Sequence, residues 1–167
     1  MSLIGHVYLL SPERASALLA DPSSLSEVID RAYNEPQVGF VDMDKAWHCL
    51  HFLLTGSAIG GDPPLGFILT GGHAVGTEDL GRGPARVFLP AQAAEIAAAL
   101  GRLEWPQLLA RFDLQKLEKL NVYPGGFREL NLRSDYEVGY YLGPFEELKR
   151  VTVKAAAEGL GMLVWIA

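Results

Sequence analysis

The residues that could do chemistry fall in two stretches of the chain. In the first, Asp44, His48 and His51 recur three and four residues apart, so on a helix they share one side. Carboxylate and imidazole groups at this spacing could hold a metal ion or transfer protons. No His-Glu-x-x-His pattern accompanies them, and Asp44 is also placed to cap a helix. We therefore expect no metal and no cofactor, and we expect His51 to donate a ring N–H to a carbonyl or carboxylate in the interior.

The second stretch is a glycine-rich loop, residues 71–86. It combines an imidazole (His73), two carboxylates (Glu78 and Asp79) and a guanidinium (Arg86) with backbone freedom, which suits a small anionic or polar ligand. It contains neither a phosphate-loop motif nor a dinucleotide fingerprint. The alternative is a structured surface loop in which Arg86 pairs with Asp79 or Glu78.

Together the two stretches supply a set of candidate ligand-binding residues. These are Trp47, His51, His73, Asp79 and Arg86. The catalytic residues stay unknown, because Cys49 lacks an activating neighbour and no Gly-x-Ser-x-Gly elbow is present.

The element that must position the first stretch is a helix over residues 42–56. An aspartate, Asp42 or Asp44, can accept from the first-turn amides, and Gly56 can adopt the left-handed conformation that ends a helix. Apolar residues cover most of the helical wheel and leave only the narrow stripe of Asp44, His48 and His51, which is typical of a helix inside the protein.

The remaining chain predicts an α+β fold, a single compact domain over residues 1–167. Two strongly apolar strands, residues 3–10 and 162–166, are expected in one small sheet that several helices cover. The predicted helices span residues 12–20, 24–33, 90–100, 104–112 and 114–120, and a long helix begins after Gly143 and Pro144. A short buried element is expected at 65–69 and a short strand at 86–89, whereas residues 127–142 give no clear pattern.

Composition narrows the classes of protein. Hydrophobic residues make up 49% of the 167 residues, which is a globular composition. One cysteine excludes an internal disulfide and favours the cytoplasm, and neither a leader peptide nor a membrane-spanning run is evident. The net charge of −6, without a dense basic stripe, argues against nucleic-acid binding. Residues 1–44 alone carry two arginines and seven acidic residues, a net charge of −5.

Three runs give the chain a family resemblance. They are KAWHCLHFLLTG at residues 45–56, DLGRGPAR at 79–86 and VYP at 122–124. In this order and spacing the chain resembles the YfbM-like family of small bacterial proteins over nearly its whole length, and Trp47, His51, Thr55 and Gly56 match the family pattern. The resemblance implies one domain of mixed helices and strands in a family without an established biochemical role, and it supplies no catalytic residues.

Three functional hypotheses are consistent with these features, and the sequence does not decide whether the protein is an enzyme. The first is a cytoplasmic binding protein that uses the loop 71–86 for a small polar ligand or a protein partner. The second is a hydrolase or transferase of low sequence signature, with His51 as acid or base and Asp79 and Arg86 positioning the substrate. The third is a structural subunit that self-associates as a homo-oligomer through its tyrosine-rich C-terminal half.

Overall fold

The computed structural model describes residues 2–167, except for the side chain of Val38. Its strands form one antiparallel sheet in the order β2-β1-β5-β4-β3. The strands are β1 (Gly5–Leu10), β2 (Phe40–Asp42), β3 (His73–Ala74), β4 (Arg86–Phe88) and β5 (Gly161–Ile166). The helices are α1 (Pro12–Ala20), α2 (Leu25–Asn34), α3 (Trp47–Thr55), α4 (Pro90–Gly101), α5 (Trp105–Leu109), α6 (Leu114–Lys119) and α7 (Asp135–Glu158). The prediction of an α+β domain whose small sheet contains the first and last strands is confirmed.

Strands β1 and β5 are the centre of the sheet and pair along their whole length. Every residue of both strands is buried. Successive side chains point to opposite faces of a sheet, so Val7 and Leu9 join one core cluster while Tyr8 and Leu10 join another. The two terminal strands are apolar without alternation because helices cover both faces of the sheet.

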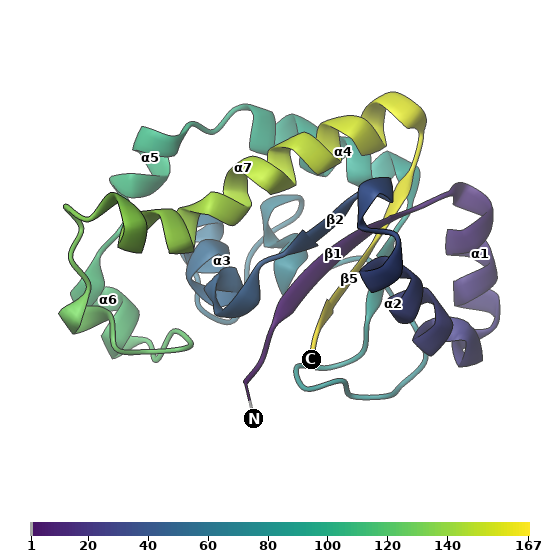
Figure 1. Cartoon of the computed structure of the whole chain (residues 1–167), viewed down its shortest axis with the longest axis horizontal. Coiled ribbons are helices and arrows are strands. Elements are labelled where there is room, and N and C mark those ends of the chain that lie inside the picture. The colour runs from purple at the N-terminus through teal and green to yellow at the C-terminus, as the bar shows by residue number, and fades with distance from the viewer. Residues whose placement is uncertain (1) are drawn as a thin grey trace.

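The helices divide between the two faces. Helices α3, α4 and α7 pack over the larger core cluster, and α1 and α2 cover the smaller one (Figure 1). Figure 1 shows α5 and α6 at the left, with α5 above the first part of α7 and α6 below it. Within residues 2–167, no helix combines the length and apolar character needed to cross a membrane.

The predicted central helix is present and deeply buried. It opens with a 3₁₀ turn, Asp44–Ala46, and continues as α3. The carboxylate of Asp42 accepts from the amide of Asp44 at 2.8 Å, and Gly56 closes the helix in the left-handed region with φ of 74°. Every residue of α3 before Thr55 is buried, including both histidines of the predicted polar stripe.

Helix α7 begins earlier than the sequence analysis predicted. The expected start after Gly143 and Pro144 was wrong, because the helix starts at Asp135 and continues through the proline. Its start is capped, since the Ser134 side chain accepts from the amide of Glu137 at 3.3 Å. Leu142 is buried and packs the first part of the helix against the core. This packing offsets the loss of one backbone hydrogen bond at Pro144. The helix predicted at residues 104–112 is also present, but it is shorter and corresponds to α5.

Candidate functional site

Trp47 is part of the core. Its side chain has no exposed surface, and its indole N–H donates to the carbonyl oxygen of Leu3 at 3.0 Å. Its ring stacks on those of His48 and Tyr123, with ring centres 4.8 and 5.8 Å apart. This placement leaves no surface of Trp47 for a ligand.

His51 is sealed in the same region. Its Nε2 lies 2.6 Å from the carbonyl oxygen of Gly60, and since a carbonyl only accepts, Nε2 carries the proton. The expectation of a donated ring N–H is therefore confirmed. Burial is the main cause that lowers the pKa of His51 to about 4, so the ring is neutral at pH 7. Its Nδ1 atom is buried and has no hydrogen-bond partner among residues 2–167.

Together with His48, His51 fixes the loop that follows α3, residues 56–72, hereafter the anchored loop. The Nε2 atom of His48 donates to the carbonyl of Ala58 at 2.6 Å, and its Nδ1 accepts from the amide of Tyr123 at 2.9 Å. Further along, the hydroxyl of Thr70 donates to the carbonyls of Gly61 and Gly66. The two imidazoles therefore hold backbone rather than a metal.

Arg86 fixes the far end of the anchored loop. Its guanidinium donates to the carbonyls of Ile68, at 2.6 Å, and Gly71, at 3.2 Å. Burial lowers its pKa to about 10, so the group stays charged at pH 7. The alternative, in which Arg86 pairs with Asp79 or Glu78, is wrong: among residues 2–167 neither carboxylate forms an ion pair with Arg86. One carboxylate oxygen of Asp79 instead accepts from the amides of Gly81 and Gly83.

The structure does not gather the five candidate residues into one accessible site. Trp47 and His51 are buried, Arg86 is partly buried, and His73 and Asp79 are exposed. Among residues 2–167, no group of three or more His, Cys, Asp or Glu side chains could hold a metal ion.

A pocket opens where the anchored loop meets helix α4. Its volume is about 60 Å³, enough for roughly four to six water-sized groups. The lining residues come from the loop, from the end of β4 and from one side of α4: Pro63, Pro64, Phe67, Thr70, Gly71, Gly72, Phe88, Gln92, Glu95 and Ile96. The glycine-rich segment thus contributes its first residues, rather than its charged ones, to the pocket.

The shape of the pocket depends on Gly72. Its φ is 69°, and a Cβ atom there would lie 2.9 Å from the carbonyl oxygen of Val87 and 3.0 Å from the ring of Phe88. Only glycine lets the backbone lie this close to the aromatic wall. Phe67 meets Phe88 edge to face, with ring centres 6.4 Å apart, and completes this wall.

Two polar groups on α4 remain available at the rim. The side-chain oxygen of Gln92 accepts from the amide of Leu89 at 2.9 Å and caps the helix. Over the part of the chain that the structure describes, neither the NH₂ group of Gln92 nor the exposed carboxylate of Glu95 has a partner. Neither residue was predicted from the sequence, although residues 92, 95, 96 and 99 recur at the spacing that puts them on one face of the predicted helix.

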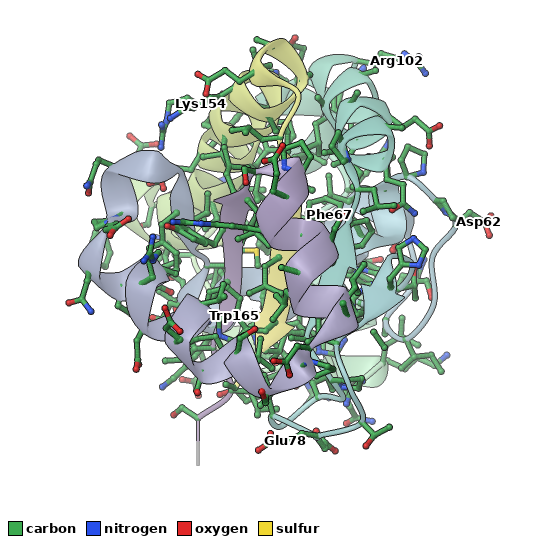
Figure 2. The ribbon with its side chains drawn as sticks, turned by 90° about the vertical axis from the view of Figure 1, so that its right-hand side faces the viewer. Asp62, Phe67, Glu78, Arg102, Lys154 and Trp165 are labelled. Atoms are coloured by element: carbon green, nitrogen blue, oxygen red, sulfur yellow. The ribbon has the colours of Figure 1, made fainter. Side chains whose placement is uncertain are left out.

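A second, larger pocket lies across Pro63 and Pro64. It has a volume of about 400 Å³, and it shares these two prolines with the first pocket. Its floor continues along the same side of α4 through Ala99 to Arg102, and Asp62 lies opposite. Figure 2 shows Asp62 and Arg102 at the right-hand edge of the molecule. The two pockets, which share Pro63 and Pro64, are hereafter called together the α4 groove.

The sheet order, the helices on both faces and the α4 groove define the class: an α+β domain whose buried histidines support a loop beside a surface pocket. The chain belongs to the family described as Domain of unknown function (DUF1877), whose model matches residues 1–165. The resemblance to YfbM-like proteins is confirmed. YfbM from Escherichia coli, a crystal structure described as that of a protein of unknown function, is 21% identical with a TM-score of 0.72, over 98% of this chain and 99% of that chain. This likeness concerns the fold, and a comparison with curated proteins gives no match.

Proposed function

We propose that this is a cytoplasmic binding protein that holds a small polar group in the pocket between the anchored loop and α4. The observation that carries the proposal is the free Glu95 carboxylate beside a preformed aromatic wall. The cytoplasmic assignment rests on the free, buried thiol of Cys49.

The pocket is held in place before any ligand arrives. His51, Thr70 and Arg86 each donate to carbonyl groups of the anchored loop. A loop fixed in this way loses little conformational entropy when a ligand binds, so a small contact area can still give useful affinity. We therefore assign these side chains a supporting role and place the ligand contacts on α4.

The available groups indicate the chemistry of the ligand. Glu95 accepts hydrogen bonds, the NH₂ group of Gln92 donates one, and Phe67 and Phe88 offer apolar surface. The volume of about 60 Å³ suits the end of a molecule rather than a whole cofactor, since pockets for drug-sized ligands have about 300 Å³ or more. A small ligand with an amine or hydroxyl group next to an apolar carbon fits this description.

The test is a ligand-observed NMR screen of small amines, alcohols and amides against the purified protein. Each hit is titrated against the parent, against Glu95→Gln and against Glu158→Gln, a matched control at the exposed end of α7. We expect Glu95→Gln to weaken binding by about tenfold, the typical effect of losing one hydrogen bond to a charged group. The control should bind as the parent does.

A hit that binds Glu95→Gln as tightly as the parent would show that α4 does not provide the contacts. The residue to mutate is Glu95 rather than Arg86, because removing Arg86 would leave two loop carbonyls without their donor and confuse binding with folding.

A protein partner is the second candidate, and the larger pocket beside the first favours it. The larger pocket extends the groove to Asp62 and Arg102, whose opposite charges could fix the direction of a bound segment. A charge-swapped protein, Asp62→Lys with Arg102→Glu, should then lose a partner that the parent retains in affinity capture.

The enzymatic alternative finds less support in this geometry. An acid or base must reach the proton that it moves, and His51 has no exposed surface while its Nε2 is committed to Gly60. Self-association has some support from Tyr136 and Tyr140 on α7, which are 86% and 38% exposed.

A further inference from the structure

A separate cavity lies on the opposite face of the sheet, between α1 and α2. Its volume is about 260 Å³, and Arg14 of α1 and Arg31 of α2 line it together with Glu27. Figure 2 looks onto these two helices. The cavity shares no residue with the α4 groove, so a ligand bound here would be independent of the proposed function.

The cavity is lined by both arginines of the N-terminal segment, residues 1–44. Residues 1–44 contain only two basic residues among seven acidic ones, and both of these arginines line the cavity. Arg31 has a loose ion pair with Glu35, 4.0 Å apart, with side chains that are 35% and 43% exposed. Over the described residues, the guanidinium of Arg14 has no hydrogen bond or ion pair. Both arginines therefore line one cavity, Arg14 with a guanidinium that is unpaired among the described residues and Arg31 in a loose pair with Glu35.

A buried hydroxyl lies in the core cluster that forms part of the cavity wall, although Tyr8 itself does not line the cavity. Tyr8 of β1 has no exposed surface, and its hydroxyl has no hydrogen-bond partner among residues 2–167. It belongs to one core cluster with Leu10 and Leu18, which line the cavity. Burial raises the pKa of Tyr8 and Glu35 raises it further, while the charges of Arg14 and Arg31 act on it in the opposite direction. The phenol is therefore a neutral donor within the field of both guanidinium groups.

An orphaned buried hydroxyl is rare, because leaving a buried polar group unpaired is costly. Because Tyr8 does not line the cavity, an acceptor held by the two arginines would satisfy this hydroxyl through a bridging water molecule. Arginine pairs with carboxylate and phosphate oxygens in a planar, bidentate geometry, so an oxyanion suits this donor set better than a neutral acceptor does.

We propose that the cavity between α1 and α2 binds a small oxyanion, the phosphate or carboxylate group of a small molecule. Arg14 and Arg31 neutralise its charge, and the hydroxyl of Tyr8 donates to it through one water molecule. Glu27 opposes the anion and limits its affinity.

The test measures thermal stability and NMR amide shifts of the full chain in rising inorganic phosphate or succinate, with sodium chloride holding the ionic strength constant. A ligand that binds only the folded state raises the melting temperature in a saturable way. The variants are Arg14→Gln with Arg31→Gln, Tyr8→Phe and Glu27→Gln, and the control is Arg150→Gln on the exposed surface of α7.

We expect saturable stabilisation of the parent and of the control, and amide shifts confined to α1, α2 and β1. The double arginine variant should lose the response, Tyr8→Phe should weaken binding by about tenfold, and Glu27→Gln should tighten it. A larger response to phosphate or to succinate identifies which oxyanion the site prefers.

Tyr8→Phe also gives a readout that does not depend on binding. Without added anion this variant should be at least as stable as the parent, because it removes an unpaired hydroxyl while keeping the ring. The proposal is overturned if neither anion stabilises the parent in a saturable way, or if the double arginine variant responds as the parent does.

Discussion

Acid should destabilise this protein through His51. Burial lowers the pKa of His51 from 6.5 to about 4 in the folded state. The unfolded chain therefore binds more protons in this interval, so the contribution is fully present above pH 6.5 and is lost as the pH falls toward 4. The difference between the two pKa values corresponds to about 3 kcal/mol in total, of which about 2 kcal/mol is lost between pH 7 and pH 4.5.

The assay is urea unfolding followed by tryptophan fluorescence at pH 7 and pH 4.5. The variant His51→Gln keeps a donor near the position of Nε2 and cannot be protonated, so it should lose about 2 kcal/mol less on acidification than the parent does. His73→Gln, which changes an exposed histidine on β3, is the matched control and should behave as the parent.

Equal losses of unfolding free energy in the parent and in His51→Gln would refute this prediction. They would show that protonation of His51 does not change the stability between pH 7 and pH 4.5. The pKa values of His48 and His6 are also lowered by burial and act in the same direction. His48 and His6 therefore contribute to the stability that His51→Gln still loses on acidification.

Two further predictions concern stability. Gly72→Ala should destabilise the protein by about 2 to 3 kcal/mol in urea unfolding, with about 1 kcal/mol from the positive φ and the rest from steric overlap with Val87 and Phe88. Gly125 has a φ of 84° and open space around it, so Gly125→Ala should lose only the contribution from the positive φ. Equal losses in the two variants would contradict the steric argument. Ser134→Ala should cost about 1 kcal/mol by removing the cap of α7, and amide hydrogen exchange should quicken at the first turn of α7; unchanged exchange there would show that the cap does not hold this end.

Local signals in the sequence were enough for most elements of the fold. Pro12 after Ser11 and the later Pro90 mark helix starts that the structure confirms, because proline favours the first turn and a serine can cap it. The N-terminal start of α7 was missed although Ser134 followed by Glu137 is a capping pattern. Glycine and proline at 143 and 144 outweighed that signal in the sequence, whereas in the structure Leu142 and Phe145 are buried on both sides of them.

The site was less predictable than the fold. The sequence indicated a functional loop from its glycines and charged residues, and it indicated that His51 would satisfy a carbonyl in the interior. It could not show that Arg86 would do the same for Ile68 and Gly71, because those contacts bridge 18 and 15 residues. A charged side chain near a glycine-rich loop looks the same in sequence whether it faces a ligand or holds backbone.

The sequence by itself determined most of the helices, that the two terminal strands are buried, and that the chain resembles YfbM-like proteins. Capping residues, turn residues and apolar spacing act over a few positions, so they can be read along the chain. Only the tertiary structure decided which polar groups remain free. Glu95 faces a pocket because the anchored loop packs against α4, and Tyr8 lacks a partner because residues of α1 and α2 bury it in the smaller core cluster. Such outcomes depend on long-range packing, which no local pattern specifies.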